Sequence, residues 1–317
     1  LKPGANIIID GQWGSTGKGK LAAYLADRSD VAYATADFQP NAGHTVVYGG
    51  RSYVLHTIPG GFVNRQAQLY LTPASSINVQ TLLHEIDMLE SFGIADRLAI
   101  HPHAGIVRQE HIDEEKNGQM VAIASTMKGV GTALAAKIRR RVALAKDVKE
   151  LWPWIKDLTP DLAMAARRGR TILVETAQGF DLSLNHGHAY PFVTSRDVTP
   201  AAALSNVGLP PQAMSTIWAC MRTFPIRVGH VYGEDGRCLG MSGPCYPDQR
   251  ELSWEHLQEM SGAPESILEK TTVTKRTRRV FSWSDQQFTK FLDVCCPTHI
   301  FINFANHIDH NVFGTKS

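Results

Sequence analysis

A glycine-rich segment near the N-terminus constrains the fold of this chain more than any other feature. Residues 11–20 read GQWGSTGKGK and hold four glycines. The apolar run before them, residues 5–10, predicts a buried strand, and residues 20–26 after them predict a helix. Glycine lets backbone N–H groups converge on an anion, and Lys18 and Lys20 add positive charge. The segment therefore predicts a phosphate-binding loop that opens an α/β domain.

The loop departs from the ordinary Walker sequence. The spacing from Gly14 to Lys20 fits GxxxxGK, but Leu21 stands where a Walker loop has the Ser or Thr that binds magnesium. A metal ion would therefore need oxygen ligands from elsewhere in the chain. A flexible turn with solvated lysines is the alternative interpretation.

The rest of the chain alternates strand-like and helix-like patterns. Residues 79–92 have apolar positions at helical spacing, and residues 46–56 predict a hairpin that turns at Gly49 and Gly50. We expect an α/β fold with a mostly parallel central sheet flanked by helices, in one domain over residues 1–317. Further strands are expected at residues 69–72, 98–101, 171–175 and 299–304, the last of them central.

Composition limits the setting. Hydrophobic residues make up 43% of the 317 residues, which suffices for a sizeable core, and no apolar run approaches the length of a membrane span. Five cysteines without CxxC spacing argue against a disulfide framework or a zinc site. With no secretion leader visible, we expect a cytoplasmic protein. The net charge of +2 is too small to imply a polyanionic partner.

Six segments, in order, resemble signatures of the adenylosuccinate synthetase family. The phosphate loop resembles GQWGDEGKGK, and residues 41–45 (NAGHT) are identical to the second signature. The other four segments are STMKGVG at 125–131, ETAQG at 175–179, HG with YPFVTS within 186–195, and TKRTRRV at 274–280, which resemble TTGRGIG, EGAQG, HGTYPYVTS and TGRPRRV.

The resemblance implies the P-loop-like fold of that family, usually a homodimer, and a Mg²⁺-dependent ligase reaction. In that reaction a nucleoside triphosphate phosphorylates the 6-oxo group of a purine monophosphate. The amine of L-aspartate then displaces the phosphate.

Three departures point to one branch of the family. Ser15 and Thr16 replace the Asp–Glu pair of the family signature. The Asp of that pair is the family's base and a metal ligand. Serine is not a base at neutral pH, but its smaller side chain leaves room for a 2-amino group. Asn303 and its two successors replace the family's guanine-recognising Lys-x-Asp, which favours ATP or dATP over GTP. The sequence also ends at Ser317, earlier than ordinary members. These departures resemble the bacteriophage 2-aminoadenylosuccinate synthases, which join aspartate to dGMP for 2-aminoadenine DNA.

Residue roles follow from the same resemblance. His44 would be the acid at the 6-oxygen, with Ser15, Gln178 and Lys18 completing the catalytic set. Ser15 and the carbonyl of Gly43 would hold magnesium. The triphosphate would contact Gly14, Thr16, Gly17, Lys18, Gly19, Lys20, Gly43, His44, Thr45 and Asn303. The monophosphate would contact Ser15, Asn41, Ala42, Ser125, Thr126, Gln178, Thr194 and, across a dimer interface, Arg140. Aspartate would be bound by Thr274, Arg276 and Arg278, because a dicarboxylate suits forked donors.

Other interpretations stay open. The arginine loop can be a solvated or nucleic-acid-binding patch, and residues 137–141 can be a solvated helix face. The whole chain can be a conventional synthetase using IMP and GTP, or a catalytically silent purine-nucleotide-binding protein. We expect neither nucleic acid nor membrane as a partner, since only Phe281 and Trp283 lie near the basic runs. The base that replaces the family Asp, the choice between ATP and dATP, and the preference for a 2′-deoxy sugar stay undetermined.

Overall fold

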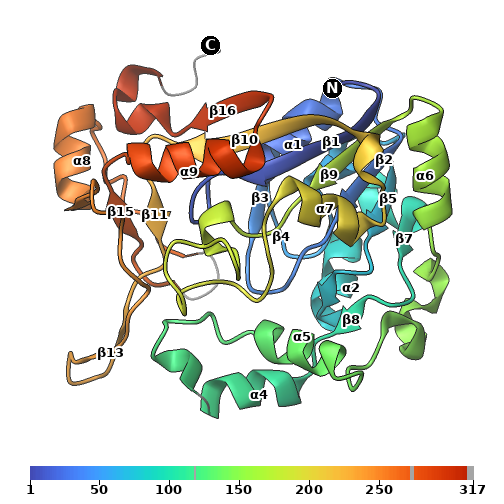
Figure 1. Cartoon of the computed structure of the whole chain (residues 1–317), viewed down its shortest axis with the longest axis horizontal. Coiled ribbons are helices and arrows are strands. Elements are labelled where there is room, and N and C mark those ends of the chain that lie inside the picture. The colour runs from blue at the N-terminus through green and yellow to red at the C-terminus, as the bar shows by residue number, and fades with distance from the viewer. Residues whose placement is uncertain (118, 272–274, 313–317) are drawn as a thin grey trace.

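A central parallel sheet organises the computed structural model, which describes residues 1–117, 119–271 and 275–312. Neighbouring strands all pair in parallel, which confirms the expected α/β class (Figure 1). The order across the sheet is β16 (His299–Asn303), β10 (Met214–Arg222), β1 (Gly4–Asp10), β9 (Thr171–Glu175), β2 (Tyr33–Ala36), β5 (Gln68–Leu71) and β7 (Leu98–Ile100).

Strand β1 lies inside the sheet and is buried along its whole length. Ile8 belongs to the apolar cluster on the face covered by α1 (Lys18–Asp27), while Ile7 belongs to the cluster on the other face. That second cluster includes residues of α6 (Thr159–Arg167) and α7 (Pro200–Val207). A strand covered on both faces needs apolar residues at successive positions, which explains the continuous run seen in the sequence.

The remaining helices surround the sheet at its ends and below it. In Figure 1, α8 lies at one end of the molecule, α6 at the other, and α4 and α5 beneath, while α9 lies in front of β10 and packs against β1 and β10. Their bounds are α2 Val79–Met88, α3 Ile94–Arg97, α4 Gln109–Asn117, α5 Val130–Ile138, α8 Trp254–Ser261 and α9 Asp285–Cys295. Short 3-10 helices lie at Gly60–Val63, Glu90–Phe92, Gln119–Val121, Ala145–Asp147, Lys149–Trp154, Phe180–Leu182, Pro211–Ala213, Ala305–His307 and His310–Val312.

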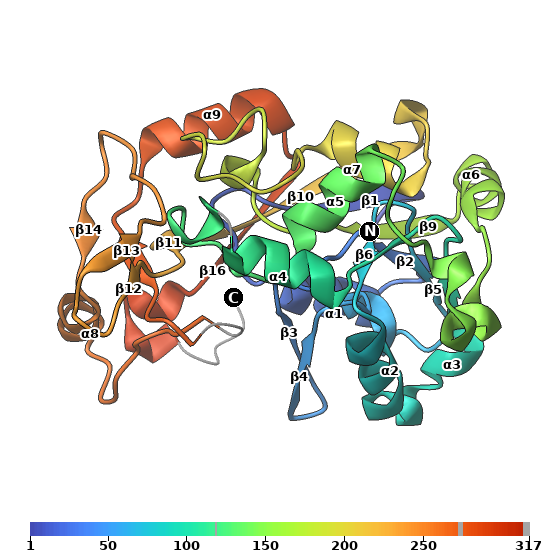
Figure 2. The same ribbon diagram turned by 90° about the horizontal axis from the view of Figure 1, so that it is seen from below.

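Smaller strands stand beside the main sheet. The expected hairpin is present as β3 (His44–Tyr48) and β4 (Arg51–Leu55), which projects from the sheet in Figure 2. It turns through Gly49 and Gly50, both at positive φ. The other strands are β6 (Ser76–Ile77) with β8 (Gly105–Ile106), β12 (Val231–Tyr232) with β13 (Cys238–Gly240), and β11 (Ile226–Arg227) with β15 (Arg279–Phe281) and β14 (Glu251–Leu252).

Three expectations about elements need correction. The strand expected to be central, β16, forms an edge of the sheet. Ile300 and Ile302, at alternate positions on one face of this strand, are 43% and 54% exposed, so that face is open to solvent. The helix expected over residues 79–92 ends at Met88 and is followed by a 3-10 turn. The basic run 137–141 extends past the end of α5 at Ile138 and so is not one helix face.

Two further points concern the whole chain. Among the described residues, no helix is both long enough and apolar enough to cross a membrane. The expectation that residues 1–317 form one domain stays a prediction.

Candidate functional site

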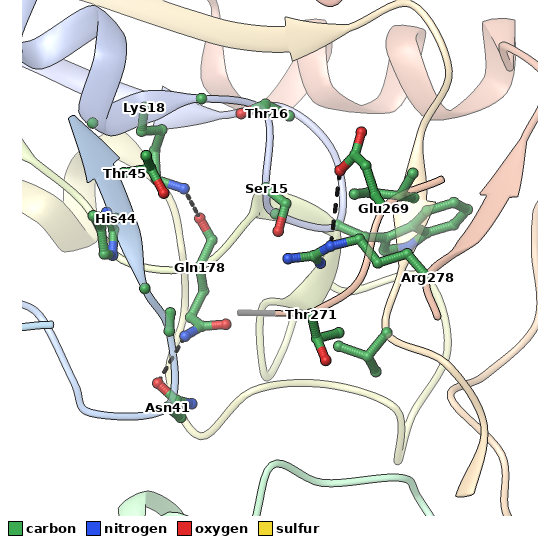
Figure 3. Close-up of a pocket in the computed structure, with 18 of the residues that line it drawn as sticks. Ser15, Thr16, Lys18, Asn41, His44, Thr45, Gln178, Glu269, Thr271 and Arg278 are labelled. Atoms are coloured by element: carbon green, nitrogen blue, oxygen red, sulfur yellow. Dashed lines mark hydrogen bonds and ion pairs between the residues drawn. The ribbon is translucent and has the colours of Figure 1, made fainter. Parts of the chain in front are cut away.

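Two adjoining cavities lie where the loops after the parallel strands meet. The larger has a volume of about 340 Å³ and the smaller about 140 Å³. Figure 3 looks into the larger one, between the loop after β1 and the segment that carries Glu269 and Thr271. The carboxyl edge of a parallel sheet is where α/β proteins usually bind ligands. Both cavities are lined by Trp13, Asn41, Thr126, Gln178, Leu182 and Val228.

The loop after β1 is built around the side chain of Asp10, which is fully buried. One carboxylate oxygen accepts from the N–H groups of Gln12 (2.9 Å) and Gly14 (3.2 Å). The other accepts from the hydroxyl of Thr16 (2.6 Å), the N–H of Thr16 (3.3 Å) and the ammonium of Lys18 (3.4 Å). The glycine-rich loop therefore already encloses an anion, and that anion belongs to the protein.

This arrangement changes which groups can receive a phosphate. The N–H groups of Gln12, Gly14 and Thr16 are engaged by Asp10, as is the Thr16 hydroxyl. The first turn of α1 remains, with Gly17 at its N-cap and no side chain capping it. The N–H groups of such a first turn have no partner inside the helix and carry the positive end of the helix dipole. Residues expected to contact the triphosphate that line the larger cavity are Gly14, Thr16, Gly17, Lys18, Gly19, Lys20, Gly43, His44 and Thr45.

His44 is held in a fixed orientation beside this turn. Its Nδ1 lies 3.2 Å from the carboxylate of Glu175, and its ring stacks on Phe38 at 3.7 Å between centroids. Because a carboxylate accepts, Nδ1 carries the proton and Nε2 is left to face elsewhere. Within the described part of the chain, Nε2 is buried without a hydrogen-bond partner, and His44 lines the larger cavity. A buried, unpartnered ring nitrogen on a cavity wall is suited to meet a ligand oxygen.

Gln178 connects the two cavities, because it lines both. Its carbonyl accepts a 2.7 Å hydrogen bond from Lys18, and its side-chain amide donates to Asn41 at 2.9 Å (Figure 3). Its φ of 64° lies in the left-handed region that non-glycine residues rarely adopt. Strained conformations of this kind gather at functional sites, where the surroundings hold them in place.

Ser15 occupies the opposite wall with its side chain exposed to solvent. Its φ of 58° is also left-handed, and its carbonyl accepts from Arg222 at 3.2 Å. Arg222 is fully buried and forms an ion pair with Glu269, which Arg278 also approaches at 3.9 Å. Burial opposes ionisation of Glu269, but the two arginines and their hydrogen bonds outweigh it, so the pKa of Glu269 lies below its usual value.

The segment at the end of β16 closes the larger cavity. Asn303 does not line the cavity but donates to the carbonyl of Thr16 at 3.2 Å, so it supports the phosphate loop from behind. Phe304 does line it, and its ring packs against the guanidinium of Arg222 at 3.9 Å.

The residues expected at the monophosphate divide between the two cavities. Ser125, Thr126 and Thr194 line the smaller one together with Asn41 and Gln178. Ala42 and Ser15 line the larger one. Arg140 lies beyond the end of α5, is exposed, and lines neither cavity.

The residues expected at aspartate are in three different situations. Arg278 lines the larger cavity. Arg276 lines neither cavity, and its guanidinium donates to the carbonyls of Ser125 (2.9 Å), Gly229 (3.2 Å) and Ala124 (3.4 Å). In this conformation it therefore braces the wall of the smaller cavity. Thr274 lies outside the described residues.

Four carboxylates at the site were not singled out from the sequence. Asp10, Glu175 and Glu269 hold the groups described above, and Glu115 of α4 accepts from the N–H groups of Gly129 and Gly131 at 2.7 and 2.9 Å on the wall of the smaller cavity. Asp10 and Glu175 each end an apolar strand, and a charged residue at such a place is a signal the sequence does contain. Glu115 and Glu269 stand in polar surroundings that give no comparable signal.

Comparisons with known proteins show the family of this chain. The sequence profile of the family described as adenylosuccinate synthetase matches residues 7–151 and 142–291. The chain is 38% identical to an N6-succino-2-amino-2′-deoxyadenylate synthase of Salmonella phage PMBT28, over 96% of this chain and 86% of the phage protein. It is 32% identical to the adenylosuccinate synthetase of Thermococcus onnurineus, over 97% of this chain and 86% of that protein.

Solved structures give the same picture. A succinoaminodeoxyadenylate synthetase of cyanophage S-2L, solved with dGMP and dATP, superposes with a TM-score of 0.82 at 36% identity, covering 96% of this chain and 85% of the other. The fully ligated adenylosuccinate synthetase of Plasmodium falciparum superposes with a TM-score of 0.77 at 21% identity, covering 94% and 76%, and shares the fold.

Proposed function

This chain belongs to the adenylosuccinate synthetase family, and from that premise we propose that it is a ligase joining the amine of L-aspartate to C6 of dGMP. ATP or dATP drives the reaction through a 6-phosphoryl intermediate. The product is N6-succinyl-2-amino-2′-deoxyadenylate, a precursor of 2-aminoadenine DNA. Support comes from the 38% identity to a phage synthase of that name and from the cyanophage structure with dGMP and dATP.

The observation that carries the choice of dGMP is Ser15 on the cavity wall. It stands where the family signature has an aspartate, and it is small and uncharged. A guanine 2-amino group beside N1 then meets space and a hydroxyl instead of a carboxylate. The carboxylates that line the two cavities, Glu269 and Glu115, are both engaged, one by arginines and the other by backbone N–H groups.

Phosphoryl transfer uses the wall formed by α1 and β3. The first turn of α1 and the Lys18 ammonium neutralise charge on the triphosphate. The γ-phosphorus forms a bond to O6 of the purine while its bond to the diphosphate oxygen breaks, and the N1 proton of the purine passes to water. In the form that carries both ring protons, His44 donates Nδ1–H to Glu175 and Nε2–H to O6 and the moving phosphoryl group. Gln178 binds the 6-oxo edge through its amide.

The second step forms the C–N bond. The aspartate amine attacks C6, the C6–O bond breaks, and the departing phosphate takes the proton that the amine loses. Arg278, with Thr274 and Arg276, binds the aspartate carboxylates by forked, charge-assisted hydrogen bonds. For Arg276 this requires its guanidinium to exchange backbone carbonyls for substrate. Ser125, Thr126, Thr194 and Asn41 bind the monophosphate from the smaller cavity.

Magnesium is the metal we propose for this site. The donor set fits, because Mg²⁺ takes hard oxygen ligands and commonly relies on substrate phosphates in place of a protein cage. Ser15 offers a hydroxyl and Gly43 a carbonyl on the wall of the larger cavity, and no cluster of three acidic, His or Cys ligands occurs within the described ranges. When bound, the ion would neutralise phosphate charge.

We also propose that the enzyme is a homodimer acting in the cytoplasm, of the host cell if the protein is viral. The exposed Arg140 lines neither cavity of its own chain, which suits a residue that reaches the monophosphate of a second copy. Mixing Arg140→Ala protein with an inactive Lys18→Ala protein tests this, since heterodimers would then regain one intact site.

Product formation tests the function itself. The protein is incubated with aspartate and magnesium, and with dGMP, GMP or IMP paired with ATP, dATP or GTP, and products are identified by mass spectrometry. Succinylated product from dGMP with an adenine triphosphate supports the proposal. Product from IMP with GTP alone makes the chain a conventional synthetase, and no product from any pairing leaves a silent nucleotide-binding protein.

A further inference from the structure

A buried glutamate lies behind the segment that carries Gly43 and His44. Glu85 of α2 is 1% exposed, and its carboxylate accepts three backbone N–H groups from the turn that follows β4. The donors are His56 at 2.5 Å, Thr57 at 3.0 Å and Ile58 at 2.9 Å. A buried carboxylate that receives three N–H groups from one turn fixes that turn relative to its own helix.

The turn at residues 56–58 also holds the segment that carries Gly43 and His44. The Nδ1 of His56 lies 2.8 Å from the carbonyl oxygen of Ala42, and because a carbonyl only accepts, Nδ1–H is the donor. Ala42 is followed directly by Gly43 and His44, which line the larger cavity. Strand pairing adds a second link, since His44 pairs with Leu55 across the β3–β4 hairpin. Contacts thus run without a gap from α2 to the proposed acid.

We propose that Glu85 and His56 are positioning residues of this enzyme: Glu85 fixes the turn at residues 56–58, and His56 then holds Ala42 so that Gly43 and His44 keep their places on the cavity wall. Neither residue lines a cavity, so they act through the segment and not on a substrate. The inference rests on the proposed function for its catalytic consequence, and on the hydrogen bonds alone for its structural part.

The charge of Glu85 makes the proposal testable by pH. Burial raises the pKa of Glu85 to about 7. The three N–H groups lower this pKa because they favour the charged form, but burial has the larger effect. Below that pH the carboxyl group gains a proton, and an O–H facing an N–H donor cannot accept from it. The groups facing the His56 ring are the Ala42 carbonyl, His44 and Lys128, and burial is the main cause that lowers the pKa of His56. Near pH 7, then, the carboxyl group of Glu85 changes charge, while the lowered pKa of His56 favours the neutral form of its imidazole.

The first experiment compares Glu85→Gln with wild type across pH. Glutamine keeps the shape but has no charge and one acceptor oxygen. Glu90 is exposed and begins the short 3-10 helix that follows α2, so it supplies the matched control Glu90→Gln. We expect the kcat of wild type to exceed that of Glu85→Gln about tenfold at pH 8. The ratio of the two kcat values should approach one at pH 6, where Glu85 of the wild type is itself neutral. A ratio that is constant with pH, or equal to that of Glu90→Gln, overturns the proposal.

The second experiment tests His56 by rescue. His56→Leu removes the donor, whereas His56→Asn places an amide N–H near the position of Nδ1. Loss of kcat in the leucine variant and recovery in the asparagine variant, with the KM for aspartate unchanged in both, support positioning. Equal loss in both variants overturns the role of the hydrogen bond.

Amide hydrogen exchange separates this proposal from the proposed function. In the protein without substrates, peptides covering residues 41–48 and 55–60 should exchange faster in Glu85→Gln than in Glu90→Gln. Unchanged exchange overturns the positioning proposal whatever the activity. A wild-type protein that is inactive with every substrate pair, but whose exchange responds to Glu85→Gln, overturns the function and leaves the support of residues 42–44 standing.

Discussion

Asp10 and Glu175 each bind a residue that lines the larger cavity, and Glu269 lines that cavity itself. Asp10 holds Lys18, Glu175 holds His44, and Glu269 pairs with Arg222, whose guanidinium also binds the carbonyl of Ser15. At the scale of single residues, the proposed catalytic groups are therefore oriented by carboxylates behind them. Acidic side chains that orient a base or a cation in this way commonly set which proton or charge it presents.

The first prediction concerns Ser15. Ser15→Asp should lower turnover of dGMP on the order of 100-fold and give measurable turnover of IMP, because a carboxylate takes the space of the 2-amino group. Aspartate tolerates the left-handed φ of 58° at this position, so the loop should keep its shape. Steady-state rates with both monophosphates measure the change. Ser15→Asn, which has the same shape without the charge, should lose dGMP turnover without gaining IMP; equal gain in both variants contradicts the role given to the charge.

The second prediction concerns His44. His44→Gln should lower kcat about 100- to 10,000-fold while the KM for dGMP changes little, because the acid acts in the transition state. Glu175→Gln should lower kcat by a smaller factor, since His44 would stay present but lose the acceptor that orients Nδ1–H. The two effects should not add in the double variant. A Glu175→Gln protein with wild-type kcat would show that this pair does not matter for catalysis.

Sequence alone reached the residues that carry motifs and missed those that support them. The placement of Lys18, His44 and Gln178 on a common cavity followed from motif order, and the structure brings them together. Glu175 could not be paired with a partner, because its contact with His44 joins residues 131 positions apart. The partners of Asp10 lie only two to eight positions away, but they depend on a loop conformation that periodicity does not give. The arginine loop shows the opposite limit: the motif gives Arg276 and Arg278 alike, while the fold directs Arg276 to backbone carbonyls.

At the scale of elements, the junction of β1, the loop and α1 depends on glycines for two different reasons. Gly14 and Gly17 both have φ near 100°, where other residues are strained. A Cβ on Gly14 would meet nothing within 4 Å, whereas a Cβ on Gly17 would lie 2.3 Å from the side-chain nitrogen of Asn303. Gly17 therefore allows both the turn and the close approach of the segment after β16.

The third prediction uses this difference. Gly14→Ala should destabilise the fold by about 1–3 kcal/mol through backbone strain alone. Gly17→Ala should do the same and in addition displace Asn303 from the Thr16 carbonyl, raising the KM for the triphosphate about tenfold or more relative to Gly14→Ala. Chemical denaturation and steady-state kinetics on both variants measure the two effects. Identical triphosphate KM values in the two variants would contradict a supporting role for Asn303.

Elements with strong periodicity could be predicted, and those with weak signals could not. The run at residues 5–10 is predictable because it is short, apolar and followed by glycines, and the hairpin at 46–56 is predictable because Gly49 and Gly50 mark its turn. Strand β2 was missed because its four residues, YATA, include two alanines, which have little strand preference. Strand β10 has no alternation, since it is buried on both faces along most of its length.

At the scale of the whole molecule, neighbours in the sheet are far apart in the chain. Strand β1 lies between β9 and β10, whose residues follow it by more than a hundred positions. Periodicity identifies a strand but not its neighbours, so it does not predict that β16 lies at an edge of the sheet. The same long-range pairing brings the 178 loop, the 15–20 loop and the segment after β16 to one edge of the sheet, where the larger cavity forms.

The fourth prediction links Glu85 to global stability. Its folded pKa of about 7 lies above that of an unfolded glutamate, so between pH 5 and 7 the folded state binds more protons than the unfolded state. This contribution to the free energy of unfolding is complete below pH 4.5 and is lost as pH rises through 7, by up to about 1.4 kcal/mol per pH unit. Urea denaturation of wild type and Glu85→Gln from pH 5 to 8 measures it. The difference between the two proteins should change by that slope; parallel curves would contradict the raised pKa.

The carboxylate of Asp10 has a consequence for how tightly a triphosphate can be bound. A loop that encloses its own anion is already ordered before any nucleotide binds. Binding therefore does not have to select a rare conformation or order a flexible loop around the phosphates. The same resident charge repels the incoming phosphates and holds part of the lysine's attraction for itself. We therefore expect a moderate affinity for the nucleotide at a site whose geometry is already formed. An enzyme that releases a diphosphate at every turnover benefits from a binding site that is rigid but does not bind the diphosphate tightly.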